Sequence, residues 1–151
     1  MSQAVNLHGC AITIGGLGIL VRGPARSGKS ALCLSALRRG ASLGLHTRLV
    51  ADDRVVVARS DAGIVLSAPA TLRGLIEVSG IGILHEETVA SAVLGLVIDL
   101  CDPAVIERLP ENGTTAIFDV NVRHARLPAR DAAFGADILV SLVMAPLVDD
   151  R

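Results

Sequence analysis

The chain has 151 residues, a net charge of −1, and a composition that is 51% hydrophobic but only 1% aromatic. This length is typical of one domain with a sizeable core, which Leu, Val, Ile and Ala must fill because the chain has two Phe and no Trp or Tyr. The near-neutral balance gives no electrostatic footprint for nucleic acid or an anionic membrane surface, and no Lys/Arg run supports a local basic patch.

The cysteines and the apolar runs indicate the compartment. Cys10, Cys33 and Cys101 are widely spaced and form no Cys-x-x-Cys or Cys/His metal pattern, which favours reduced thiols. The apolar runs are too short to cross a bilayer, and the first residues lack the features of a signal peptide. We therefore expect a soluble, cytoplasmic protein with neither nucleic acid nor membrane as a partner.

The first half of the chain predicts strands around one helix. Residues 11–23 predict two short strands joined by a Gly-Gly turn. Residues 29–40 predict a helix that stops at Arg-Arg-Gly, whose glycine is Gly40. Residues 47–53 predict a short strand that ends in two aspartates, and residues 54–69 predict a hairpin with Ser-Asp-Ala-Gly as its turn.

The pattern from residue 70 onward is less regular. Residues 70–84 mix helical spacing with β-branched residues, so their class stays open. The near-continuous apolar run at 90–100 predicts a buried strand. Residues 114–122 predict one further strand.

Residues 130–147 predict a closing helix, with Asp131 near its N-terminus and Pro146 at its end. No internal repeat, low-complexity tract or linker interrupts the chain. Strands that alternate with helices favour an α/β fold. We therefore expect residues 1–151 to form a single α/β domain.

Residues 23–30 read GPARSGKS and match G-x-x-x-x-G-K-[ST] in full. The motif follows a predicted strand and opens a predicted helix, where backbone N–H groups and the helix N-terminus can surround an anion. Lys29 is expected to reach the β- and γ-phosphates, and the Ser30 hydroxyl to ligate Mg²⁺. The bland alternative is a glycine-rich connection. Arg26 either touches phosphate or faces solvent, and we favour solvent. The nucleotide-binding candidates are Gly23, Ser27, Gly28, Lys29, Ser30 and Ala31.

Asp52 and Asp53 follow the apolar strand 47–51. A carboxylate at the end of a neighbouring strand commonly orients Mg²⁺ in phosphate-loop proteins. Both can face the phosphate only if the strand has ended, because successive strand residues point to opposite faces. One would then serve the metal and the other would take a proton from an attacking hydroxyl. A solvated acidic turn paired with Arg54 is the alternative, and no Asn-Lys-x-Asp motif is present to indicate a GTPase.

Four segments, in order, resemble the catalytic domain of the HPr kinase/phosphorylase family, whose members phosphorylate a serine of the phosphocarrier protein HPr. The segments are LHG (7–9), GPARSGKSALCLSALRRG (23–40), LVADDRV (49–55) and LRGLIEVSGIGIL (72–84). The resemblance implies a mixed β-sheet with flanking helices, ATP and Mg²⁺ as cofactors, HPr or an HPr-like protein as partner, and a homo-oligomer. It also implies the reverse reaction, phosphorolysis of the phosphoserine, and a role in regulating carbohydrate metabolism.

The family's functional residues can be carried over by position. Asp52 matches the aspartate that acts as base toward the serine and as acid in the reverse reaction, and Asp53 would assist at the metal or phosphate. His8 matches a histidine that contacts the catalytic aspartate and tunes its proton affinity. Glu77 matches a glutamate that helps bind Mg²⁺. Arg130 stands where the family has an arginine that contacts phosphate and the protein substrate.

The chain departs from the family pattern at Ala31, where glutamate is usual, and at Ser79, where arginine is usual. It also begins almost directly at the catalytic domain, so we expect no separate N-terminal domain. These departures keep two alternatives to the HPr kinase open. One is a nucleotide-binding regulatory module with little transfer activity, and the other is a phosphate-loop kinase for a different substrate.

Overall fold

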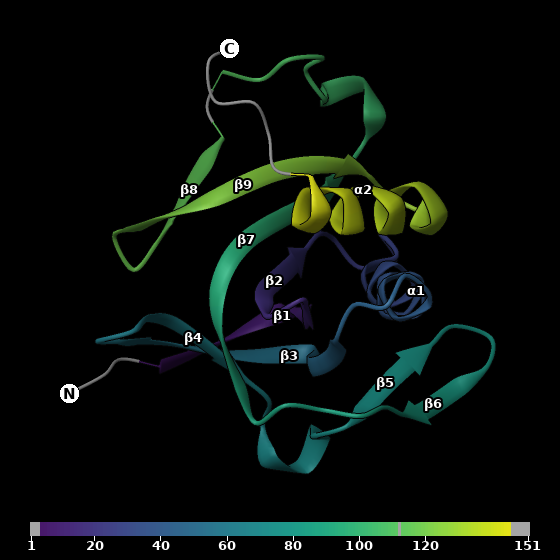
Figure 1. Ribbon diagram of the computed structural model, residues 1–151, viewed down its shortest axis with the longest axis vertical. Coiled ribbons are helices and arrows are strands. Elements are labelled where there is room, and N and C mark those ends of the chain that lie inside the picture. Colours follow the sequence, from purple (N-terminus) through teal and green to yellow (C-terminus); the bar gives the residue numbers. More distant parts are fainter. Residues whose placement is uncertain (1–3, 112, 146–151) are drawn as a thin grey trace.

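A computed structural model describes residues 4–111 and 113–145, and within them the chain forms nine strands and two α-helices (Figure 1). Short 3₁₀ turns precede β5 and β8. The helices are α1 (Lys29–Ser42) and α2 (Ala132–Met144). The strands are β1 (Ala4–Ile14), β2 (Leu17–Arg22), β3 (Thr47–Ser60), β4 (Gly63–Ser67), β5 (Leu75–Val78), β6 (Gly82–His85), β7 (Ser91–Cys101), β8 (Thr114–Ile117) and β9 (Val120–Pro128).

The main sheet has seven strands in the order β2-β1-β3-β4-β7-β9-β8, and β2 also pairs in parallel with β7. The pairings among β2, β1, β3, β4 and β7 therefore close on themselves. The long strand β3 permits this closure because its residues 47–58 pair with β1 while its last residues, 56–60, pair with β4. The strands β5 and β6 form a separate two-stranded sheet.

Alternating side chains of the main sheet supply two apolar cores, one on each face. The first core packs Ile12, Ile98 and other strand residues against the helices, where Leu139 of α2 is fully buried. The second core gathers residues from all five strands of the closed ring, such as Leu20 and Val57, without any helix residue. Each fully buried aliphatic side chain contributes about 1.5–3 kcal/mol relative to an exposed one.

The structure confirms the two strands around the Gly-Gly turn, the hairpin after Arg54, the strand at 90–100 and both helices. Helix α1 runs to Ser42, past the stop expected at Gly40. A Cβ at Gly40 would lie 2.7 Å from Thr47 Cγ2, so this glycine permits close packing instead of ending the helix. The α/β class with a mixed sheet and flanking helices is confirmed.

Two expectations need correction, and one assignment that was left open is resolved. The strand that contains Asp52 and Asp53 does not end there, because β1 pairs with it across both aspartates. Residues 70–84 form a 3₁₀ turn and the β5–β6 hairpin, since Ile76 is buried in the first core. Residues 114–122 form two strands, because positive φ angles at Phe118 and Asp119 turn the chain.

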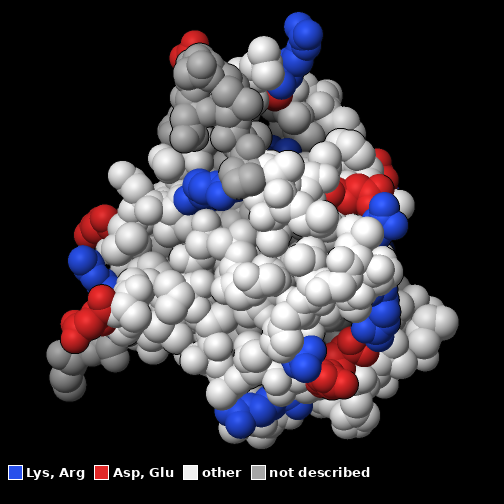
Figure 2. Space-filling model, in the orientation of Figure 1, with Lys and Arg blue, Asp and Glu red and all other residues white. Residues whose placement is uncertain are grey.

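Helix α2 begins as expected beside Asp131, whose carboxylate accepts a hydrogen bond from the Phe134 N–H at 3.4 Å. Pro146, the expected end of this helix, lies outside the described residues. Within the described part of the chain, neither helix is long and apolar enough to span a membrane. On the face in Figure 2, charged residues are scattered singly or in mixed groups around a broad uncharged surface.

Candidate functional site

The glycine-rich loop connects β2 to α1 through a backbone path that few residue types allow. Gly28 caps the helix with φ 92°, and Arg26 has φ 65°. A Cβ at Gly23 would lie 2.6 Å from Ser27 Oγ and 3.1 Å from Leu100 Cβ, so a side chain has no room there. The Lys29 ammonium reaches back along the loop and donates to the carbonyls of Gly23 at 2.9 Å and Pro24 at 3.0 Å. This loop at a helix N-terminus has the form of an anion cradle.

A cavity of about 930 Å³ opens in front of the loop. Most of the residues expected from sequence line it together: His8, Gly23, Gly28, Lys29, Ser30, Ala31, Asp52, Asp53 and Glu77. Arg26 is exposed, as expected, and also lines the cavity. Ser27 does not: its hydroxyl is buried, and its N–H donates to the Pro24 carbonyl at 3.1 Å. The cavity combines cations from the loop with carboxylates from β3 and β5.

Asp52 is buried on the floor of this cavity, with both carboxylate oxygens engaged. The Ser30 hydroxyl donates to Oδ1 at 2.6 Å, and the backbone N–H of Glu77 donates to Oδ2 at 2.9 Å. The side chain is only 5% exposed. Asp52 thus ties the first turn of α1 to β3 and to the root of the β5–β6 hairpin.

Asp53 is exposed and borders the same cavity, although strand alternation should point it away from Asp52. Its φ of 70° explains the difference, because this left-handed backbone breaks the alternation within β3. From the sequence, both carboxylates were expected to face the phosphate only if the strand ended before them. The positive φ of Asp53 brings both carboxylates to the cavity although the strand continues. Asp53 pairs in register with Gly9, so His8 lies one residue along on β1.

Two thiols lie close to Asp52 but are fully buried in the first core and do not line the cavity. Cys10 pairs in register with Asp52, and Cys33 lies on the buried face of α1. Burial raises the pKa of the Cys10 thiol well above its ordinary value, and the neighbouring Cys33 and Asp52 raise it further. Cys10 is therefore held as a neutral thiol. Like Cys10 and Cys33, Cys101 is unpaired in the described residues, in keeping with the expected reduced state.

Arg130 touches the loop through its backbone. Its N–H donates to the Ser27 carbonyl at 2.9 Å, and its Cα lies 3.5 Å from the position of a Cβ on Gly28. The residue is exposed, has φ 57° and is absent from the lining of the loop cavity. Arg130 thus contacts the loop from the segment that follows β9, while the N–H of the neighbouring Ala129 donates to the Cys101 carbonyl at the end of β7 at 2.8 Å.

Sequence reasoning missed a charged network directly before the loop. Arg22, the last residue of β2, donates two hydrogen bonds of 2.9 Å to Asp99 on β7, and His124 Nε2 on β9 lies 2.7 Å from the same carboxylate. Partial burial acts to raise the pKa of Asp99, but the bonds from Arg22 and His124 outweigh it and leave this pKa below its ordinary value. The signal in the sequence was a charged residue at the end of each of two buried strands.

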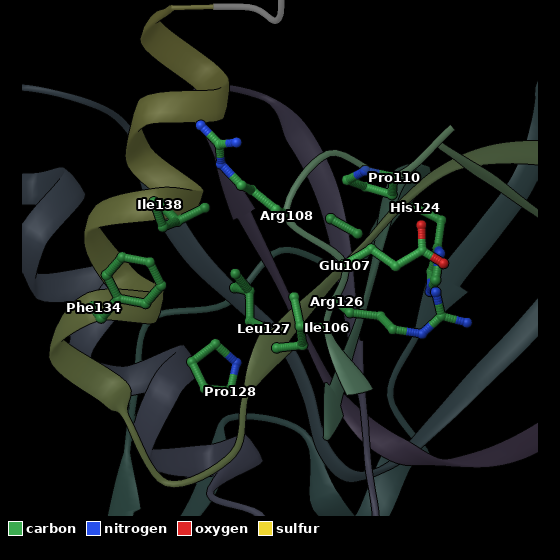
Figure 3. Close-up of a pocket in the computed structure, with 11 residues that line it drawn as sticks. Ile106, Glu107, Arg108, Pro110, His124, Arg126, Leu127, Pro128, Phe134 and Ile138 are labelled. Atoms are coloured by element: carbon green, nitrogen blue, oxygen red, sulfur yellow. The ribbon is translucent and has the colours of Figure 1, made fainter. Parts of the chain in front are cut away.

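A second, smaller cavity of about 250 Å³ lies between β9, α2 and the segment before β8 (Figure 3). Aliphatic and aromatic side chains, including Leu127 and Phe134, form most of its wall. Arg108 and Arg126 border it but extend in different directions (Figure 3). It has neither a glycine-rich loop nor a pair of carboxylates. The loop cavity is therefore the candidate active site.

Comparison with known proteins gives a consistent result. Residues 1–149 match the family described as the HPr Serine kinase C-terminal domain. An HPr kinase/phosphorylase of Geobacillus sp. (strain WCH70) is 35% identical over 142 residues, which cover 86% of this chain and 44% of that protein. One from Limosilactobacillus reuteri (strain DSM 20016) is 44% identical over 84 residues, which cover 55% of this chain and 24% of that protein.

A solved structure of the HPr(Ser) kinase/phosphatase from Coxiella burnetii superimposes with a TM-score of 0.78 at 26% sequence identity. The match covers 93% of this chain and 88% of that chain. By contrast, the chain spans less than half the length of the two curated relatives above.

Proposed function

The chain belongs to the HPr serine kinase C-terminal domain family, and from this premise we propose that it transfers the γ-phosphoryl group of ATP to a serine hydroxyl of HPr or an HPr-like protein. The observation that carries the proposal is the convergence of a complete phosphate loop and two adjacent carboxylates on one cavity. The loop supplies binding for the triphosphate, and the carboxylates supply a metal-orienting group and a base.

The donors in the cavity fit Mg²⁺. Ser30, Asp52, Asp53 and Glu77 offer hydroxyl and carboxylate oxygens, the ligands that this hard cation prefers. Among the described residues, no three acidic, His or Cys side chains converge into a ready metal site. This suits Mg²⁺, which commonly binds through one or two protein ligands, substrate phosphates and waters. When bound, Mg²⁺ would neutralise charge on the phosphates.

Lys29 binds the triphosphate in this scheme. Its ammonium now donates to two loop carbonyls at 2.9 and 3.0 Å, which hold the side chain along the cradle. A phosphate oxygen is a stronger, charged acceptor, so the lysine exchanges one of these bonds for a charge-assisted bond when nucleotide binds. Arg26 lines the same cavity and adds a second positive charge beside the phosphates.

The two aspartates divide the remaining work. Both oxygens of Asp52 already accept hydrogen bonds, and its burial keeps it from an incoming protein substrate. We assign Asp52 to orienting the Ser30 hydroxyl toward the metal position. Asp53 is exposed at the cavity, so it is the better-placed base. The geometry thus favours the reverse of the division that the family resemblance implied, in which Asp52 was the base.

In the forward reaction the substrate serine gives its proton to Asp53 while its oxygen forms a bond to the γ-phosphorus. The bond between that phosphorus and the β–γ bridging oxygen breaks, and ADP leaves. In phosphorolysis, protonated Asp53 returns the proton to the serine oxygen while inorganic phosphate takes the phosphoryl group. Asp53 pairs in register with Gly9 on β1, and the neighbouring His8 also lines the cavity. His8 is therefore positioned to influence the proton on Asp53.

The test is label transfer from γ-labelled ATP with Mg²⁺ to purified HPr from the same organism. Wild-type protein is compared with Lys29→Ala and Asp53→Asn, and Mg·ATP affinity is measured in parallel. Labelled HPr that is lost in both variants is the expected result. Tight Mg·ATP binding without any phosphoprotein would instead favour the nucleotide-binding regulatory module. That alternative is supported by Ser79, which lines the cavity at the position where the family usually has arginine. Transfer to a substrate other than HPr would favour a different kinase.

A further inference from the structure

The β5–β6 hairpin extends from the body of the protein (Figure 1), and its residues Glu77 to Ser79 line the loop cavity. An isolated two-stranded hairpin is at best marginally stable in water, so its root must hold it. Ile76 is fully buried and Leu84 packs against the same core. The Glu86 N–H donates to the Gly74 carbonyl at 2.9 Å, and the Glu86 carboxylate pairs with Arg38 of α1 at 2.7 Å. The root is firm, and the far end projects freely.

The two faces of the hairpin have different surroundings. Ile76 pairs with Leu84 on the face toward the core, so the neighbouring pair, Glu77 and Ile83, lies on the opposite face. Directly paired residues of antiparallel strands have Cβ atoms about 4.5–5.5 Å apart. Glu77 lines the loop cavity, and Ile83, which is not part of the cavity lining, is its cross-strand neighbour.

The tip of the hairpin exposes more apolar surface than its position requires. Ile81 is 73% exposed and Ile83 is 64% exposed. No charged residue occurs from 78 to 84, and the charge nearest in the strand register is the exposed Glu77 opposite Ile83. Exposed aliphatic side chains that cluster beside a functional cavity are typical of an interaction site.

We propose that Ile81 and Ile83 dock the protein substrate, a folded protein that carries an apolar patch next to the hydroxyl group to be phosphorylated. This inference rests on the proposed function. A hydroxyl on a folded protein reaches Asp53 only if the protein surface around that hydroxyl contacts the residues at the cavity rim. Since residues Glu77 to Ser79 form part of that rim, the adjoining tip contacts the substrate.

The uncharged segment 78–84 and the neighbouring Glu77 determine which partner fits. A strongly acidic patch would face the exposed carboxylate of Glu77 opposite Ile83, whereas an apolar patch gains burial against the two exposed isoleucines. A second copy of this chain is the rival occupant, and a small-molecule substrate would need no apolar platform outside the cavity. Each of these alternatives predicts a different response to changes at the tip.

The experiment compares the double variant Ile81→Ser/Ile83→Ser with the matched double variant Val105→Ser/Leu109→Ser. The control residues are 62% and 67% exposed and do not line the loop cavity. The affinity for purified HPr is measured by titration of protein saturated with Mg²⁺ and a non-hydrolysable ATP analogue. We expect the tip variant to bind HPr at least about tenfold more weakly and the control to change less than about twofold. Both variants should keep the wild-type affinity for the nucleotide and the wild-type melting temperature.

Unchanged HPr affinity in the tip variant, with transfer by the wild-type protein intact, would overturn the docking proposal alone. A tip variant that changes only the sedimentation behaviour would overturn it in favour of a contact between copies. If the wild-type protein neither binds nor labels HPr, the proposed function fails, and the docking proposal fails with it.

Discussion

The two cavities of this protein are built in opposite ways. The loop cavity depends on unusual backbone at Arg26, Gly28 and Asp53, all with positive φ, and on the buried carboxylate of Asp52. The second cavity (Figure 3) is walled mainly by apolar side chains from the regular elements β9 and α2 and from the segment before β8. Regular elements satisfy their own backbone groups, so they leave few N–H groups for a ligand. Chemistry therefore gathers where the backbone departs from the regular pattern.

The comparison predicts its largest effect at Lys29. Replacing Lys29 by Ala removes the charge that faces the transferred phosphoryl group, and transfer to HPr should fall on the order of 10²–10³-fold. Arg126→Ala, which removes a cation from the second cavity, should leave both Mg·ATP affinity and transfer unchanged. Labelling assays on the two variants measure this contrast. Equal losses in both would contradict the assignment of the active site to the loop cavity.

Helix α2 has one side in the first core and another at the second cavity, and substitutions on the two sides should differ in their effect on stability. Leu139 is fully buried in the first core, whereas Phe134 is 47% exposed at the second cavity. Leu139→Ala should lower the free energy of unfolding by about 2–5 kcal/mol, because it leaves a cavity in a packed core. Phe134→Ala should lower it by only about 1 kcal/mol, since much of the ring is already in water. Urea unfolding gives both values, and a reversed order would disprove the assignment of the core.

A smaller effect is expected from the network at Asp99. Its pKa lies below the ordinary value because the bonds from Arg22 and His124 outweigh partial burial. Because the pKa is lowered in the folded protein, the ionised carboxylate of Asp99 stabilises the fold at pH values above the unfolded-state pKa of about 3.9. This stabilisation is lost as the pH falls through the folded-state pKa. The difference in unfolding free energy between wild type and Asp99→Asn should therefore be full at pH 5 and shrink below about pH 4.

The matched control for this pH dependence is Asp137→Asn. Asp137 pairs with Arg39 at 2.9 Å, but its side chain is 58% exposed, so the pair contributes little. Its removal should leave the pH profile of unfolding close to that of the wild-type protein. If the pH profile of unfolding for Asp99→Asn also matches that of the wild-type protein, the network of Arg22, Asp99 and His124 does not contribute pH-dependent stability.

The sequence predicted the features that depend on neighbouring residues. The loop at 23–30, the two strands before it and helix α1 follow from glycine positions and local periodicity, and the structure has them in place. Gly40 was misread because a glycine that ends a helix and one that permits close packing look alike in sequence. The β5–β6 hairpin was left open because only the burial of Ile76 in a distant core selects strand over helix.

The features that the sequence could not predict arise from contacts between distant residues or from rare dihedrals. Arg22, Asp99 and His124 meet across three strands, with Arg22 and Asp99 separated by 77 positions. The closure of the ring through the β2–β7 pairing is equally non-local. The φ of 70° at Asp53 has no signal in sequence, because positive φ is uncommon for any residue other than glycine. This one dihedral brings both carboxylates to the cavity.

The most direct test of this division of roles measures the Mg²⁺ dependence of transfer to HPr for Asp52→Asn and Asp53→Asn. If Asp53 is the base, Asp53→Asn loses transfer by roughly 10²–10⁴-fold while its Mg²⁺ requirement stays that of the wild type. Asp52→Asn should instead need more Mg²⁺, because the hydrogen bond that orients Ser30 is altered. The opposite pattern, with transfer lost in Asp52→Asn at an unchanged Mg²⁺ requirement and retained in Asp53→Asn, would contradict the assignment.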